Sequence, residues 1–120
     1  MRVATFGLEH VAERDAEVTL VALTGELDLT NVDDLDARLA ALSNALPLVL
    51  DLSRLVFVDS AALHRLFRIV RGRGVGGVAF VIEPTAPVAA TLAIVELGRA
   101  APLVATRDAA VAALKRTSSL

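Results

Sequence analysis

One serine of this 120-residue chain has the setting of a phosphate acceptor. Ser60 follows Asp59 after an apolar run, where the helical pattern of residues 62–70 begins. Serine at such a position is first of all a helix N-cap, because its oxygen accepts a hydrogen bond from a backbone N–H. A phosphoryl group on the same oxygen would meet exposed N–H groups and the positive end of the helix macrodipole. Two roles therefore stay open for Ser60, a cap and an acceptor of phosphate on an exposed surface.

A small enzyme built on Asp28, Asp59 and Ser60 is the rival chemistry. It would need a base of suitable pKa, and the chain has no cysteine, no lysine near these residues, and only His64 as a candidate. The absence of cysteine also excludes thiolate zinc sites and iron–sulfur clusters. His10 and His64 lie too far apart for metal-ligand spacing. We therefore expect no catalysis, no metal and no cofactor.

A glycine-rich segment imitates a dinucleotide-binding motif. Gly72, Gly74 and Gly77 match the pattern GxGxxG. The true motif requires a strand before the glycines and a helix after them. Here the helical pattern comes first and an apolar run at 77–82 follows. We interpret the segment as a helix stop and a turn, without nucleotide binding.

Length and composition indicate one globular domain over residues 1–120, with its core at about 4–114. The chain is 55% hydrophobic and 22% charged, with a net charge of −2. That charge, and the absence of Trp and Tyr, argue against nucleic acid as a partner. No apolar run approaches 18 residues, and charge comes too early for a signal peptide. We expect a cytoplasmic protein without a membrane partner.

The hydropathy pattern alternates buried strands with amphipathic helices. We expect strands at 3–11, 17–24, 46–51, 77–82 and 103–105. We expect helices at 32–42, 62–70, 87–97 and 107–114. The order β-β-α-β-α-β-α-β-α requires helical crossovers, so the fold class is α/β, with a mixed, largely parallel β-sheet covered by about four helices.

Several element ends are expected at particular residues. Thr30 is expected to cap the first helix and Thr106 the fourth, because threonine is a favoured N-cap. Gly98 is expected to stop the third helix. Turns are expected at 13–15 and ahead of a second apolar run at 55–58.

Three segments together resemble the STAS domain of anti-sigma factor antagonists. They are Gly25–Asp28, Leu48–Ser53 and Phe57–Leu63, in the family's order and spacing. The tail 87–114 is similar to the family's closing helix–strand–helix. The resemblance covers about residues 4–114 and implies a SpoIIAA-like domain, a β-sheet core covered by helices.

The resemblance also implies a function in bacterial signalling. Such proteins bind an anti-sigma factor, usually a serine kinase, and thereby free a sigma factor to act in transcription. The kinase phosphorylates a serine that follows Asp at the start of the second main helix, and a phosphatase reverses the step. The matching residue here is Ser60, and Asp28 matches the family's acidic position before the first long helix. The expected partner-binding residues are Asp28, Asp59, Ser60, Ala62, His64 and Arg65.

The chain departs from the family's pattern directly after the acceptor. The family commonly has Asp-Ser-Ser/Thr-Gly-Leu, whereas this chain has Ala61 and Ala62 at the third and fourth positions. The Cβ of Ala62 is expected to crowd a partner. The alternative function is a STAS-like module of a larger signalling assembly, binding a protein or small ligand without phosphoregulation.

Overall fold

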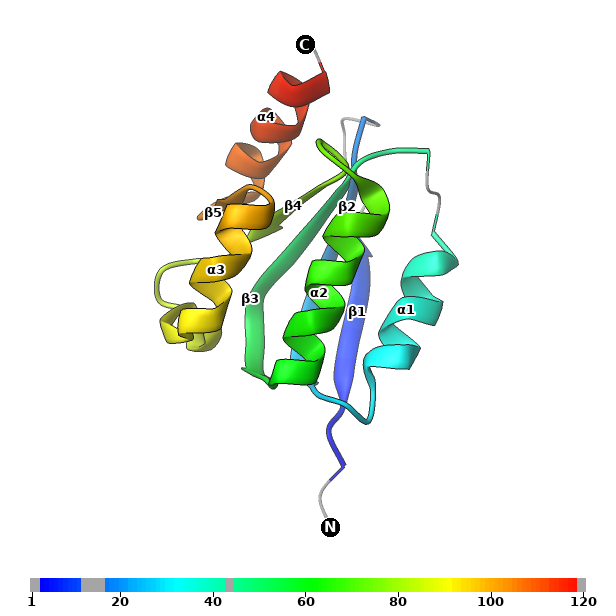
Figure 1. Ribbon diagram of the computed structural model, residues 1–120, viewed down its shortest axis with the longest axis vertical. Helices are drawn as coiled ribbons and strands as arrows, with labels where there is room; N and C mark the ends of the chain where they lie inside the picture. The colour runs from blue at the N-terminus through cyan, green and yellow to red at the C-terminus, as the bar shows by residue number, and fades with distance from the viewer. Residues whose placement is uncertain (1–2, 12–16, 43–44, 119–120) are drawn as a thin grey trace.

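The computed structural model describes residues 3–11, 17–42 and 45–118, and within them the chain forms a sheet flanked by helices (Figure 1). The strands are β1 Phe6–Val11, β2 Thr19–Leu27, β3 Leu48–Val58, β4 Val78–Val81 and β5 Leu103–Val104. The helices are α1 Val32–Ala40, α2 Ser60–Arg73, the 3₁₀ helix η1 Pro87–Ala90, α3 Leu92–Ala100 and α4 Arg107–Ser118. The predicted order of strands and α-helices is confirmed. The turn expected at 13–15 lies outside the described residues.

The five described strands lie side by side in chain order. β1 runs antiparallel to β2, and every later pair is parallel. Each parallel connection steps to the next strand in the same direction, and such crossovers are right-handed. Consequently α1, α2 and α3 all lie on one face of the sheet, the face toward the viewer in Figure 1. The predicted mixed, largely parallel sheet is confirmed.

The core has two parts because the parallel strands are covered on both faces. The larger part lies under α1, α2 and α3, and its side chains include Leu23, Leu50 and Phe80, all 0% exposed. The smaller part joins residues of the opposite face, such as Leu20 and Val49, to α4. β2 supplies both parts by alternation, which explains its continuous apolar sequence.

β3 is one strand of 11 residues, so the turn expected ahead of residues 55–58 is wrong. Its pairing with β2 shifts register twice, between Asp51 and Arg54 and between Leu55 and Phe57. These irregularities place extra residues on β3 without ending it. They keep Leu55 buried and bring β3 to the same edge of the sheet as β2.

The helix expected at 87–97 is interrupted. η1 ends before Thr91, whose backbone is extended, and α3 begins at the next residue. Gly98 does not stop α3, because the helix continues to Ala100. A Cβ on Gly98 would lie 3.3 Å from the side chain of Leu103, so this glycine permits close packing of α3 on β5.

The glycine-rich segment forms the predicted turn between α2 and β4. Gly74 is the C-cap of α2, with φ +76° and ψ −177°, and its N–H donates to Val70. Gly76 also has a positive φ.

The start of α4 is capped by Thr106. The Ala109 N–H donates to Oγ1 of Thr106 at 3.1 Å, as predicted for a cap.

Candidate functional site

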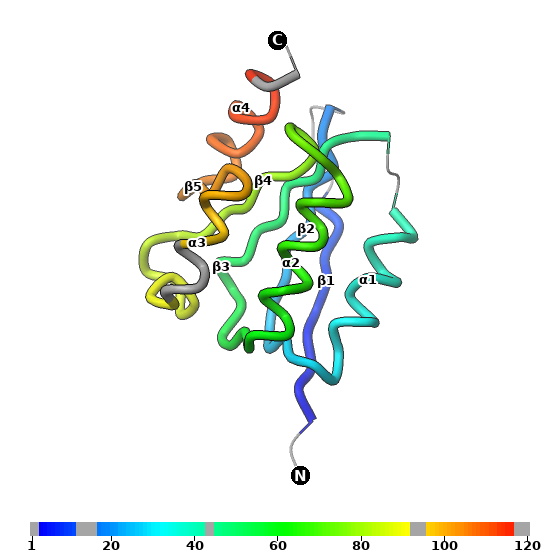
Figure 2. The backbone as a smooth tube through the Cα atoms, viewed as in Figure 1, coloured from blue at the N-terminus to red at the C-terminus, as the bar shows by residue number. Residues whose placement is uncertain are grey.

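The strand ends bring Asp28 and Asp59 to one edge of the sheet. β2 and β3 are parallel, and their last residues, Leu27 and Val58, are paired. The Asp59 N–H donates to the Leu27 carbonyl at 3.2 Å. Both connections to the following helices therefore begin side by side, at the lower end of the tube in Figure 2.

Gly25 gives the end of β2 its shape. Its φ is +88°, and a Cβ there would lie 2.4 Å from the carbonyl oxygen of Thr5. The same oxygen accepts a hydrogen bond from the Glu26 N–H at 2.9 Å. A side chain at position 25 would therefore displace the segment before β1, which explains the glycine of the first family-like motif.

The loop from β2 to α1 is held by Asp28 and Asn31. Oδ1 of Asp28 accepts from the N–H and the hydroxyl of Thr30. The Asn31 amide accepts from the Asp28 N–H at 3.0 Å and donates to the Glu26 carbonyl at 2.8 Å. Asn31, and not Thr30 as expected, stands at the N-cap position of α1, and its side chain makes no capping hydrogen bond. The Thr30 hydroxyl is bound to Asp28 instead. Asn31 was missed in the sequence, although asparagine is a common residue of such turns.

Asp59 is the N-cap of α2, so the expectation that Ser60 caps this helix is wrong. Oδ1 of Asp59 accepts from the Ala62 N–H at 2.8 Å. Oδ2 accepts from the Leu29 N–H at 3.2 Å. One carboxylate thus caps α2 and also holds the loop from β2 to α1.

Ser60 is the first residue of α2, and it is exposed. Its hydroxyl makes no hydrogen bond to any other residue that the structure describes. The N–H groups of Ser60 and Ala61 lie in the first turn, where a helix has no internal acceptor for them. The Ser60 hydroxyl therefore lies at the positive end of a helix of 14 residues. It takes no part in the hydrogen bonds that stabilise this end of the helix.

The neighbouring expected residues divide between surface and core. His64 is exposed, whereas Ala62 is 1% exposed and belongs to the larger core. The methyl group of Ala62 is therefore not on the surface where we expected it to crowd a partner.

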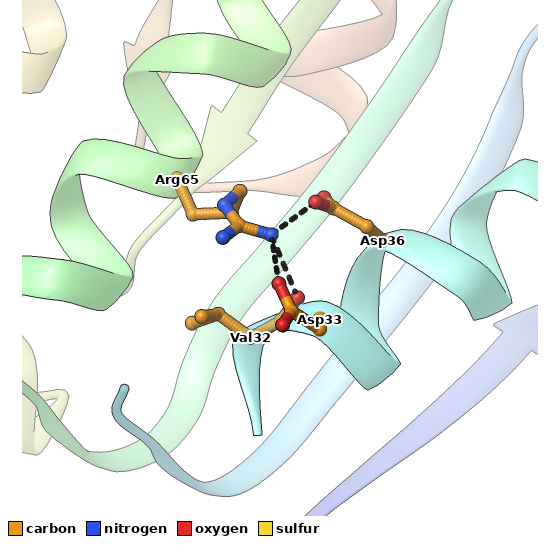
Figure 3. A network of polar contacts seen from close by, with 4 residues as sticks. All are labelled: Val32, Asp33, Asp36 and Arg65. Carbon is orange, nitrogen blue, oxygen red and sulfur yellow. Dashed lines mark hydrogen bonds and ion pairs between the residues drawn. The ribbon is translucent and has the colours of Figure 1, made fainter. Parts of the chain in front are cut away.

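Arg65 faces α1 and is held there (Figure 3). Its Nη1 donates to Asp33 at 2.9 Å, to Asp36, and to the Val32 carbonyl at 3.4 Å. The side chain of Arg65 is only 17% exposed. The hydrogen bonds to Asp33 and Asp36 raise the pKa of Arg65. Arg65 thus ties α2 to the first turns of α1.

Comparison with known proteins identifies the family. A family model described as "Mlab, STAS domain" matches residues 10–105. The chain belongs to the STAS family.

Solved structures similar to this chain were found for two other proteins. An anti-sigma factor antagonist from Mycobacterium paratuberculosis is 27% identical, with a TM-score of 0.69 over 91% of this chain and 95% of that one. A STAS-domain antagonist from Rhodobacter sphaeroides is 18% identical, with a TM-score of 0.44 over 88% and 90%. No protein of curated function matches the chain.

The STAS domain also exposes apolar side chains at this edge. Leu29, in the loop held by Asp59, is 72% exposed. Val56 and Phe57, near the end of β3, are 57% and 48% exposed. The exposure of these three side chains was not predicted from the sequence. They give the surface beside Asp59 and Ser60 an apolar component.

The described part of the STAS domain holds neither a cluster of metal ligands nor a membrane-spanning helix. Over residues 3–11, 17–42 and 45–118, no three His, Asp or Glu side chains gather as metal ligands would. In the same ranges no helix is both long and apolar enough to span a bilayer.

Proposed function

We propose that this STAS domain is an anti-sigma factor antagonist. It binds an anti-sigma factor that is also a serine kinase, and by occupying that protein it frees a sigma factor. The similarity to the Mycobacterium paratuberculosis antagonist, over nearly the whole of both chains, supports the class of partner. The observation that carries the switch is the position of the Ser60 hydroxyl, exposed and without a structural duty at the start of α2.

Phosphorylation of Ser60 is the proposed control. The kinase transfers the γ-phosphoryl group of ATP to Oγ, so that an O–P bond forms, ADP leaves, and the hydroxyl proton passes to a base of the kinase. The phosphate adds a charge of about −1.5 to −2 at the partner-binding surface. This charge weakens binding of the anti-sigma factor. The first-turn N–H groups stabilise it, and Asp59 keeps the helix capped throughout. A phosphatase hydrolyses the ester and restores binding.

The protein acts by binding and not by catalysis. Asp59, the carboxylate next to Ser60, is used by two backbone N–H groups. His64 lies one turn further along α2 and is exposed. Neither residue has the contacts of a base that activates a serine nucleophile.

The test uses candidate anti-sigma factors with kinase domains from the source genome. Each is purified and incubated with the STAS domain and ATP, and the site of modification is located by mass spectrometry. We expect phosphate on Ser60 alone, none on Ser60→Ala, and unchanged modification of a Ser43→Ala control. Displacement of a sigma factor from the same anti-sigma factor should follow addition of the unmodified protein.

Three outcomes would each contradict a different part of this proposal. Phosphate on another serine would refute the assignment of Ser60. Binding without any phosphorylation would favour the alternative, an interaction module of a larger assembly without phosphoregulation. Absence of binding to every anti-sigma factor would refute the function itself.

A further inference from the structure

The outer side of α2 carries a row of four polar side chains that begins with the acceptor. Ser60, His64, Arg68 and Arg71 are spaced by four, four and three residues, so they lie on one side of the helix. All four are exposed. The opposite side of α2 is buried against the sheet. We refer to these four residues as the α2 ridge.

The arginines of the α2 ridge differ from the others near it. Arg65 is held by Asp33 and Asp36, and Arg38 pairs with Asp34 at 3.4 Å. Among the residues that the structure describes, neither Arg68 nor Arg71 forms an ion pair. The acids of α1 nearest to α2 are already engaged by Arg65. The α2 ridge thus presents two available positive charges on a chain whose net charge is −2.

We propose that the α2 ridge binds an acidic segment of the anti-sigma factor, an inference that rests on the proposed function. Asp or Glu side chains along that segment would lie over Arg68 and Arg71. A protein fits this surface better than nucleic acid does. Nucleic-acid binding depends on neutralising many phosphates, whereas the α2 ridge offers two available arginines.

This partner chemistry explains how one phosphate could control binding. Along a helix, His64 lies about 6 Å from Ser60 and Arg71 about 16 Å from it. Charges at physiological salt are screened over about 8 Å. A phosphate on Ser60 therefore repels the acidic groups above the first two turns and leaves those above Arg71 attracted. Phosphorylation and loss of the distal arginines should weaken binding independently.

The first arm of the test uses the anti-sigma factor identified above. Its affinity is measured by calorimetry at low and high salt for the wild type and for Arg68→Glu/Arg71→Glu. We expect the double variant to bind about tenfold or more weakly at low salt, with a smaller loss at high salt. Arg54→Glu, which changes an exposed arginine of β3, is the matched control and should bind like the wild type. Circular dichroism confirms folding of each variant.

The second arm needs no anti-sigma factor. A glutamate-rich helical peptide is titrated into the ¹⁵N-labelled protein, and we expect the largest amide shifts at residues 64–71, lost in the double variant. Wild-type affinity of the double variant for the anti-sigma factor would overturn the inference while leaving the proposed function intact. Amide shifts centred outside residues 64–71 would also overturn the inference. So would duplex DNA that binds as tightly as the peptide and loses this binding in the double variant. If no anti-sigma factor binds, the proposed function fails. The peptide titration alone then tests whether the α2 ridge binds acidic segments.

Discussion

The cap of α2 and the proposed acceptor of phosphate are two adjacent residues at the start of the helix. Asp59 supplies the oxygen that the first turn needs, and Ser60 supplies the exposed hydroxyl. A chemical change at Ser60 therefore leaves the hydrogen bonds of the cap in place. This separation suits a reversible modification, because the helix does not have to unravel when phosphate is added or removed. Consistent with this, Ser60→Ala should change the free energy of unfolding by less than about 0.5 kcal/mol.

Substitution of Asp59 tests the capping role directly. Asp59→Ala should lower the free energy of unfolding by about 0.5–2 kcal/mol, because the Ala62 and Leu29 N–H groups lose their acceptor. Asp59→Asn keeps an acceptor oxygen and should cost less. Urea unfolding followed by circular dichroism measures both. Equal stability of Asp59→Ala and the wild type would contradict the role of Asp59 as the cap.

Two glycines at the C-terminal end of α2 should respond oppositely to alanine. Gly74→Ala should destabilise the fold by about 1–3 kcal/mol, because its φ of +76° with ψ of −177° is a conformation that glycine alone adopts readily. Gly72→Ala is the control. It lies within the helix with no atom near its added Cβ, and it should stabilise by about 0.5–1 kcal/mol. Thermal unfolding of both variants distinguishes backbone strain from a general effect of the added methyl.

Between elements, α1 and α2 are joined by Arg65. Arg65→Ala should lower the free energy of unfolding by about 1 kcal/mol, since three acceptors on α1 lose their donor and the acids remain largely solvated. Arg68→Ala, three residues on and without an ion pair among the described residues, should cost much less. A double-mutant cycle of Arg65→Ala with Asp36→Ala measures the coupling. Strict additivity would show that the contact contributes nothing.

Elements could be predicted from the sequence wherever hydrophobic periodicity decides them. The five strands and the order of the helices followed from it. The course of β3 could not, because register shifts let a strand continue through residues that break its alternation. The break at Thr91 has no comparable signal in the local pattern.

The sequence predicted which residues belong to the candidate site better than it predicted what those residues contact. Asp59 and Ser60 are about equally good N-caps, so only the exact end of β3 decides which of them caps α2. Arg65 lies on a flank of α2, and a helical pattern does not say on which side the neighbouring helix packs. Helical spacing alone could not show that Arg65 is held by α1 while Arg68 is exposed.

At the scale of the whole molecule, stability should depend on pH through Asp51. Burial raises the pKa of its carboxyl, but hydrogen bonds from the Ser53 N–H and from Arg107 at 2.8 Å outweigh burial and lower it. A lowered pKa in the folded state stabilises the protein above the unfolded pKa, and this stabilisation is lost as the pH falls below about 4. Arg107→Gln should therefore destabilise at pH 7 and much less at pH 3. Arg54→Gln should show no such pH dependence in urea unfolding.

The position of α4 has a consequence for synthesis of the protein. Within the described chain it is the one helix on the second face of the sheet, and it is also the last element. A chain leaves the ribosome from its N-terminus, so Leu20, Val49 and Ala79 have no cover until the 12 residues of α4 have emerged. During that interval the nascent sheet presents an apolar face that a chaperone, or another unfinished chain, can bind.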